Sequence, residues 1–386
     1  MEIYNFIKDS VLNLKPYQLI EIEPDSNLLK LDANESNYTL NKSLKRKYAD
    51  FIKETLINLY PDSGNKKLIK LLENFYNIKS VNFMFGNGSD ELISIILSSL
   101  KKDVVVNIPY PSFSMYEIIA KYNDLKVNNI NLLEDFFELP QYILEQNAVS
   151  GLHTVNSGNK KNIKSQKNIY FFSYPNNPTG NHFSYDILIS LLENKNNIIV
   201  IDEAYLFFSD KESFIKYLHK YENLIVLKTF SKIGLAGLRF GMLFAGDKLI
   251  NEFKKIKLPY NINSLTLASI EFFLNNYEFF EKNIKKTIIQ RDKLFVKLKK
   301  LSFIEIYKSD ANFIFFKLIN KNMKPDFDDF LKKNNIVIRN FTGRFENFYR
   351  ITIGLLSEND KIIEYFKEFG LNIKINDNNK KNLNHC

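Results

Sequence analysis

Short, uninterrupted apolar runs recur through the middle of the chain, and stretches with helical spacing separate them. The runs lie at 104–108, 169–173, 198–202, 224–228 and 241–245. Strands that are buried on both faces have continuous apolar sequences, so these runs predict the inner strands of one sheet. Helical patterns at 183–194 and 211–221 predict crossovers between parallel strands. The core of the chain is therefore predicted to be α/β, with a mostly parallel sheet.

The C-terminal part has a different pattern and predicts a smaller α+β domain. A charged helical stretch covers about 264–300, and the strand-like and helical segments that follow lie at 303–307, 312–317, 326–334, 336–339, 349–353 and 358–369. We expect four regions: an N-terminal segment 1–38 that packs on the small domain, a large domain 39–262, a small domain 263–373, and a disordered tail 374–386. The polar, aperiodic segment 148–168 is expected to be a surface insertion in the large domain.

Composition narrows the possible functions. The chain has 386 residues, a formal net charge of +9 and one cysteine, Cys386. A single cysteine allows no disulfide framework, and no spacing of histidine or cysteine predicts a metal site. The basic residues form no compact stripe, so we expect no nucleic-acid partner. No signal sequence or apolar span is present, so we expect no membrane association and a cytoplasmic location.

Polar motifs follow several of the predicted strands. Gly86-Asn-Gly-Ser-Asp90 opens a helical stretch, where free N–H groups and the helix dipole favour an anion. Asn176–Gly180 is a turn sequence by itself. Asp202 ends an apolar strand, where a carboxylate needs a cationic partner or serves as a structural cap. Because ligands gather at the carboxyl ends of parallel strands, Asp202 and the segment 228–229 predict a site there.

Lys232 gives these motifs a common interpretation. A lysine amine forms a Schiff base with an aldehyde, and a carboxylate such as Asp202 keeps a pyridine nitrogen protonated, which makes the ring an electron sink. Asn177 and Tyr205 are placed to hydrogen-bond a ring oxygen, and Ser231 and Arg239 flank the lysine as candidate phosphate ligands. The set predicts an enzyme that uses pyridoxal phosphate.

Two arginines on candidate strands of the small domain predict an anionic substrate. Arg350 lies between apolar residues of the segment 348–354, and Arg339 lies on the strand before it. Arginine suits bidentate recognition of carboxylates and phosphates. The alternative is that both arginines carry only surface charge.

Taken in order, these motifs resemble those of the fold-type-I aminotransferases, and within them the histidinol-phosphate aminotransferase group. The resemblance runs from about residue 28 to 370 and rests on the segments 31–35, 60–62, 86–91, 175–180, 202–205, 231–232, 235–239 and 350–354. It implies a large domain with a mostly parallel seven-stranded sheet, a small α+β domain, and a homodimer that shares its active sites. It also implies transfer of an amino group between histidinol phosphate and 2-oxoglutarate in histidine biosynthesis.

The resemblance further implies a role for each matching residue. Lys232 would bind the cofactor covalently and move the proton, Asp202 would pair with the pyridine nitrogen, and Tyr205 would bind the ring oxygen with Asn177. The cofactor phosphate would be bound by Ser89 and Asp90 from one segment and by Ser231 and Arg239 from another. Tyr60 of the neighbouring subunit would also reach this phosphate. Arg350, Arg339 and Asn34 would bind the substrate.

Two positions depart from the pattern of the group. Phe113 stands where a tyrosine usually stacks on the cofactor ring, and the segment 232–239 is one residue shorter than in many relatives. Either change could alter substrate choice. Three alternatives stay open on the same fold: an aromatic amino-acid aminotransferase, a threonine-phosphate decarboxylase and a non-catalytic regulator.

Overall fold

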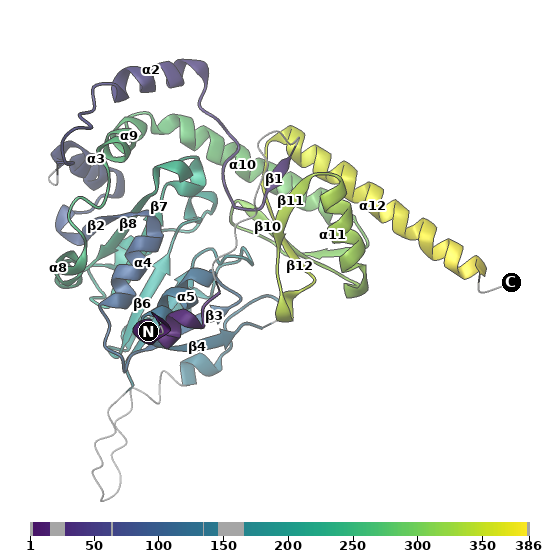
Figure 1. Cartoon of the computed structure of the whole chain (residues 1–386), viewed down its shortest axis with the longest axis horizontal. Helices are drawn as coiled ribbons and strands as arrows, with labels where there is room; N and C mark the ends of the chain where they lie inside the picture. The colour runs from purple at the N-terminus through teal and green to yellow at the C-terminus, as the bar shows by residue number, and fades with distance from the viewer. Residues whose placement is uncertain (1–2, 16–27, 63–64, 134, 146–165, 384–386) are drawn as a thin grey trace, which may run out of the picture.

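The computed structural model describes residues 3–15, 28–62, 65–133, 135–145 and 166–383 (Figure 1). Two sheets organise these residues. The larger has seven strands in the order β2-β8-β7-β6-β5-β3-β4, and the smaller has five in the order β1-β11-β12-β10-β9. The predicted α/β class, with a mostly parallel seven-stranded sheet and a smaller α+β unit, is confirmed.

The larger sheet is parallel except at β8. Its strands are β2 (Phe83–Asn87), β3 (Val105–Tyr110), β4 (Lys126–Asn131), β5 (Asn168–Ser173), β6 (Asn197–Asp202), β7 (Leu224–Thr229) and β8 (Phe240–Ala245). β3 to β7 pair in parallel, whereas β8 runs antiparallel to both β7 and β2. The parallel strands therefore bring their carboxyl ends to one edge, where β6 ends at Asp202 and β7 ends at Thr229.

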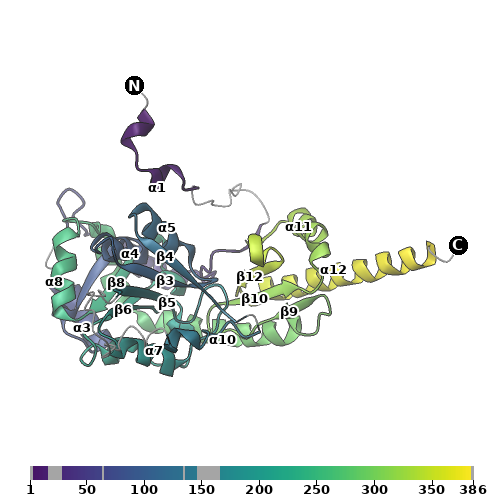
Figure 2. The ribbon, with the colours of Figure 1, turned by 90° about the horizontal axis from the view of Figure 1, so that it is seen from below.

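Helices cover both faces of this sheet (Figure 2). One face packs on α4 (Gly88–Ser98), α5 (Ser114–Tyr122) and α8 (Asp247–Ile256), and the other on α3 (Lys66–Tyr76), α7 (Tyr185–Glu193) and α9 (Ser264–Leu274). Successive strand residues alternate between these two cores: Val200 lies with α4 and α5, whereas Ile201 lies with α7 and α9. Burial on both faces explains why the strand sequences are apolar without alternation.

The smaller sheet carries the substrate-binding candidates. Its strands are β1 (Leu29–Leu31), β9 (Ile304–Ile306), β10 (Phe313–Leu318), β11 (Ile336–Asn340) and β12 (Phe348–Thr352), and its helices are α10 (Tyr277–Leu298), α11 (Lys324–Lys333) and α12 (Leu356–Leu383). β1 pairs in parallel with β11, and the other neighbours are antiparallel. Arg339 lies directly opposite Arg350 in the β11–β12 register.

The N-terminal segment divides between the two parts of the molecule. β1 joins the smaller sheet as its edge strand. The short helix α1 (Asp9–Leu12) instead lies beside α5, where Lys8 and Ser10 bind the carboxylate of Asp124 at 2.9 and 2.5 Å. Charged contacts with the larger domain therefore hold the beginning of this segment, which we expected on the smaller domain.

Other expectations differ in detail from the structure. The helical pattern at 211–221 forms only the 3-10 helix η4 (Phe214–Tyr217). α9 packs against α2 (Lys42–Ile52) and α3 of the larger domain, although we expected the smaller domain to begin at 263.

The expected tail is also helical in part, because α12 continues to Leu383 (Figure 1). No proline or glycine follows Gly370, so nothing in the sequence stops this helix. Most of the predicted insertion 148–168 lies outside the described residues. Within the described ranges, no helix is long and apolar enough to cross a bilayer.

Candidate active site

A cavity of about 80 Å³ lies at the carboxyl edge of the larger sheet. Strands β5, β6 and β7, the beginning of α4 and the segment after β7 form its walls. The side chains that line it are Ser89, Asp90, Phe113, Ser173, Asn177, Asp202, Ala204, Tyr205, Thr229, Ser231, Lys232 and Arg239. Segments that are up to 150 residues apart in the chain (Ser89 to Arg239) therefore meet around one space.

Asp202 lines this cavity and is 4% exposed. Its carboxylate accepts hydrogen bonds from the Tyr116 hydroxyl at 2.6 Å and from the Ala204 N–H at 3.1 Å. Burial raises the pKa of Asp202 to about 6, although both hydrogen bonds act in the opposite direction. A buried carboxylate with a raised pKa favours a cationic partner, such as a protonated ring nitrogen.

The beginning of α4 forms an anion cradle. Gly88 has φ +77°, and a Cβ added there would lie 2.6 Å from Nη2 of Arg239. Gly241 packs on the same turn, since its added Cβ would lie 2.4 Å from the Gly88 carbonyl carbon. Arg239 Nη2 binds the Asp90 carboxylate at 2.8 Å. Free N–H groups at a helix N-terminus beside an arginine and hydroxyl groups suit a phosphate.

The hydroxyl groups of this cradle come from both sides of the β7 terminus. Thr229 Oγ1 lies 2.7 Å from Ser231 Oγ, and the Ser231 N–H also donates to Thr229 Oγ1 at 3.1 Å. Both side chains line the cavity together with Ser89 and Arg239.

Lys232 extends into the same cavity from the 3-10 helix η5 (Ser231–Ile233). Its Nζ lies 3.4 Å from the Ala33 carbonyl oxygen and 5.8 Å from the centre of the Tyr205 ring. The Tyr205 hydroxyl accepts a hydrogen bond from Asn34 Nδ2 at 3.0 Å. Asn34 is buried with φ +55°, and the Thr352 hydroxyl holds its N–H at 2.9 Å. The segment after β1 thus connects the smaller sheet to Tyr205 and Lys232 at the cavity.

Arg350 also points toward this site. Its guanidinium donates to Asn177 Oδ1 and to the Asp32 carbonyl oxygen, both at 2.5 Å, and it lies 5.3 Å above the centre of the Phe313 ring. It is buried, so it is not a surface charge. Arg339 lies opposite it on β11 but does not line the cavity.

Tyr60 is the one predicted cofactor ligand that lies away from the cavity. It is 80% exposed, and its ring stacks on Tyr260 with 4.6 Å between the centres. Thr229, at the end of a predicted strand, lines the cavity as expected, whereas sequence reasoning gave no role to Tyr116 or Ser173. Tyr116 lies in an apolar helix stretch, so only the fold reveals that its hydroxyl reaches Asp202.

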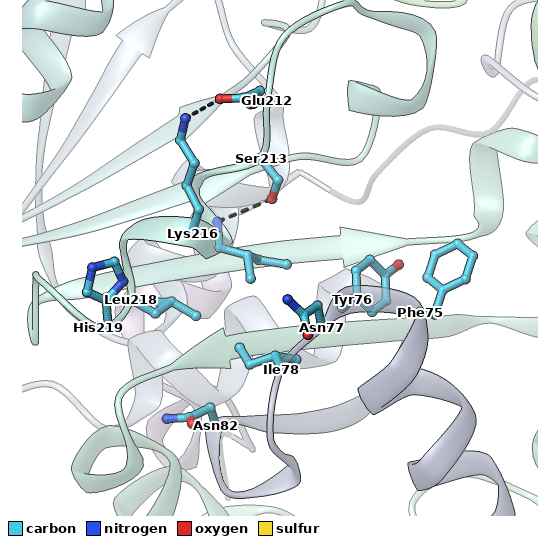
Figure 3. Close-up of a pocket in the computed structure, with 11 residues that line it drawn as sticks. Phe75, Tyr76, Asn77, Ile78, Asn82, Glu212, Ser213, Lys216, Leu218 and His219 are labelled. Carbon is cyan, nitrogen blue, oxygen red and sulfur yellow. Dashed lines mark hydrogen bonds and ion pairs between the residues drawn. The ribbon is translucent and has the colours of Figure 1, made fainter.

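A larger hollow of about 700 Å³ lies elsewhere, at the end of α3 and against the segment 212–219 (Figure 3). Tyr76, Asn77, Ser213, Lys216 and His219 are among its lining side chains. It contains none of the residues that surround Lys232.

The residues of the smaller cavity fit pyridoxal phosphate. Asp202 would hold the ring nitrogen, Tyr205 and Asn177 the ring oxygen, and the cradle at α4 the phosphate, while Lys232 would supply the amine that binds the aldehyde. When bound, the cofactor supplies the electron sink for bond cleavage next to an amine. Fold and site together define a fold-type-I enzyme of the pyridoxal-phosphate class.

Comparisons with known proteins give the family. The model of the aminotransferase class I and II family matches residues 26–366. The chain is 36% identical to a histidinol-phosphate aminotransferase of Pyrococcus furiosus over 94% of this chain and 98% of that one.

Solved structures agree with this match. The chain resembles the crystal structure of the histidinol-phosphate aminotransferase from Clostridium acetobutylicum with a TM-score of 0.77 and 25% identity, over 89% of this chain and 100% of that one. A Sinorhizobium meliloti histidinol-phosphate aminotransferase in complex with pyridoxal-5'-phosphate shares the fold, with a TM-score of 0.78 and 18% identity over 94% and 98% of the two chains. The chain belongs to the aminotransferase class I and II family, which confirms the predicted class of enzyme and its cofactor.

Proposed function

We propose that this aminotransferase transfers the amino group of histidinol phosphate to 2-oxoglutarate. Arg350 is the observation that carries the proposal. It is a buried guanidinium that binds Asn177, a candidate ligand of the cofactor ring, and so lies beside the reacting centre. One arginine in this position suits both the phosphate of histidinol phosphate and a carboxylate of 2-oxoglutarate. The names of the relatives at 36% and 25% identity support the same substrate.

Steady-state kinetics with three amino donors tests this choice. Histidinol phosphate, phenylalanine and threonine phosphate are compared at a fixed concentration of 2-oxoglutarate. We expect the highest kcat/KM for histidinol phosphate. A higher value for phenylalanine would assign the enzyme to aromatic amino acids, and release of CO₂ from threonine phosphate would make it a decarboxylase.

Arg350→Ala tests the role of the arginine. We expect kcat/KM for histidinol phosphate to fall by about 100-fold, the size of loss typical for a buried charged contact, while cofactor affinity changes little. Lys317→Ala is the matched control, because Lys317 lies on the neighbouring strand in a surface pair with Glu305. Equal loss of substrate and cofactor binding would make Arg350 a structural residue.

The same proposal includes a homodimer. Tyr60 lies outside the cavity of its own chain, in an exposed apolar surface formed by Leu56, Ile57, Leu59, Tyr60, Leu258 and Tyr260. Such a surface is typical of an interface between subunits. In the dimer, Tyr60 would bind the cofactor phosphate of the neighbouring subunit.

A further inference from the structure

A buried ion pair lies directly behind the active site. Lys228 Nζ is 2.6 Å from Glu203 Oε2, and the two residues are 5% and 0% exposed. The rings of Tyr76 and Phe207 lie 5.6 and 5.7 Å from the same Nζ. Buried ions lose their hydration, and a well-packed apolar pair of similar volume often stabilises a fold as well or better. Stability alone therefore gives no reason for an ion pair at this place.

The pair occupies the opposite face of the sheet from the cofactor cavity. Glu203 follows Asp202, and Lys228 precedes Thr229, so side-chain alternation places each ion behind a residue that lines the cavity. The Glu203 N–H donates to the Leu227 carbonyl at 2.8 Å, which extends the β6–β7 ladder by one residue. The ion pair therefore joins the two strand ends that carry Asp202 and Thr229.

Glu203 also closes the loop that carries Tyr205. Its two carboxylate oxygens accept hydrogen bonds from Ser213 Oγ and from the Phe214 N–H, each at 2.6 Å. Residues 204–212 thus form a loop, and the residues that follow it, Ser213 and Phe214, return to the side chain of the residue that precedes it, Glu203. Ser213 also lines the large hollow, where Figure 3 shows it beside Lys216. The Glu203 carboxylate therefore contacts the far end of the loop that begins after Asp202 and contains Tyr205.

We propose that Glu203, held by Lys228, is a positioning residue that fixes Asp202 and Tyr205 at the separation that the cofactor ring requires. The proposal rests on the cofactor-binding role of Asp202 and Tyr205 in the proposed function. Neither ion lines the cavity, so their effect on the reaction passes through the backbone and through hydrogen bonds.

The double variant Glu203→Gln, Lys228→Met tests this role, because it removes both charges and leaves neither ion buried alone. We expect hydrogen exchange in the cofactor-free protein to become faster in residues 204–213. We also expect about tenfold weaker cofactor binding and about tenfold lower kcat, since small misplacements of reacting groups have effects of this size. KM for the amino donor should remain unchanged, because Arg350 is untouched.

Two further variants keep the test decisive. Lys216→Met is the matched control, since Lys216 forms an exposed pair with Glu212 in the same segment, and it should leave all these values unchanged. Ser213→Ala removes a single donor to Glu203 and should weaken cofactor binding by about two- to threefold, the size expected for one hydrogen bond.

The outcomes separate the two proposals. A folded double variant with normal exchange, cofactor affinity and kcat would overturn the positioning role, as would normal values for Ser213→Ala if the double variant does not fold. A wild-type protein that does not bind the cofactor would instead overturn the proposed function.

Discussion

Burial raises the pKa of Asp202, the residue proposed to pair with the ring nitrogen of the cofactor. Asp202 follows four consecutive apolar residues of β6, and its pKa is raised to about 6 because the carboxylate has lost water. Hydrogen bonds from Tyr116 and Ala204 compensate only in part. The site is therefore unfavourable for this anion, and a protonated ring nitrogen, as in the proposed function, would reduce the penalty.

Asp202→Asn is expected to stabilise the cofactor-free protein while weakening cofactor binding. The folded pKa lies above the ordinary value of 3.8, so the native state holds the proton longer than the unfolded state. Stability from this group is then present below pH 4 and is lost as the pH rises toward 6. Removing the carboxylate should add about 3 kcal/mol at pH 8, from a shift of roughly two pKa units.

Denaturant unfolding of both proteins at pH 8 and pH 4.5 measures this effect, and a titration with pyridoxal phosphate measures affinity. The gain in stability should be much smaller at pH 4.5. Equal stability of wild type and variant at pH 8, or unchanged cofactor affinity, would contradict this account of Asp202.

At the scale of elements, the apolar runs predicted the inner strands because burial on both faces leaves a clear pattern. β4 was missed, since its sequence Lys-Val-Asn-Asn-Ile-Asn is mostly polar and it lies at an edge of the sheet. Lys232, Asp202, Tyr205 and Asn177 could be predicted from motifs that follow strands. Tyr116 and the Glu203–Lys228 pair could not, because their contacts join segments that no local pattern relates.

The junction of β2 and α4 forms the proposed phosphate cradle. Gly88→Ala would place a methyl group 2.6 Å from Arg239 at φ +77°, a conformation that costs about 1–2 kcal/mol for residues with a side chain. We expect cofactor affinity to fall at least tenfold. Gly237→Ala is the control, because nothing lies within 4 Å of its added Cβ, and it should bind the cofactor normally. Equal affinities in a fluorescence titration would show that the turn is not the phosphate site.

At the scale of the whole molecule, the site depends on contacts between distant parts of the chain. The segment after β1 links the smaller sheet to Tyr205 through Asn34, and Arg350 links β12 to Asn177. In the proposed dimer, the site also depends on a second subunit, because Tyr60 and the surrounding apolar surface belong to the subunit interface. Composition and charge predicted none of these long-range contacts.

Mixed dimers test the shared site. Tyr60→Ala and Lys232→Ala should each reduce activity strongly, because each removes one residue from every site. When the two variants are unfolded and refolded together, about half of the dimers contain one chain of each kind. Each such dimer has one intact active site, so about a quarter of all active sites are intact. We expect activity to return to roughly that fraction of wild type. A mixture no more active than its separate components, although dimeric by sedimentation, would contradict a shared site.

Lys232 is the most direct test of the central claim, that its amine carries amino transfer in the site formed with Asp202. The measurement is the visible absorbance of protein loaded with pyridoxal phosphate, before and after addition of histidinol phosphate, for wild type and for Lys232→Ala. Wild type should show the absorbance of the covalently bound cofactor and lose it rapidly when the donor is added. The variant should bind the cofactor without that absorbance and should not turn over. Normal turnover by Lys232→Ala would contradict the account.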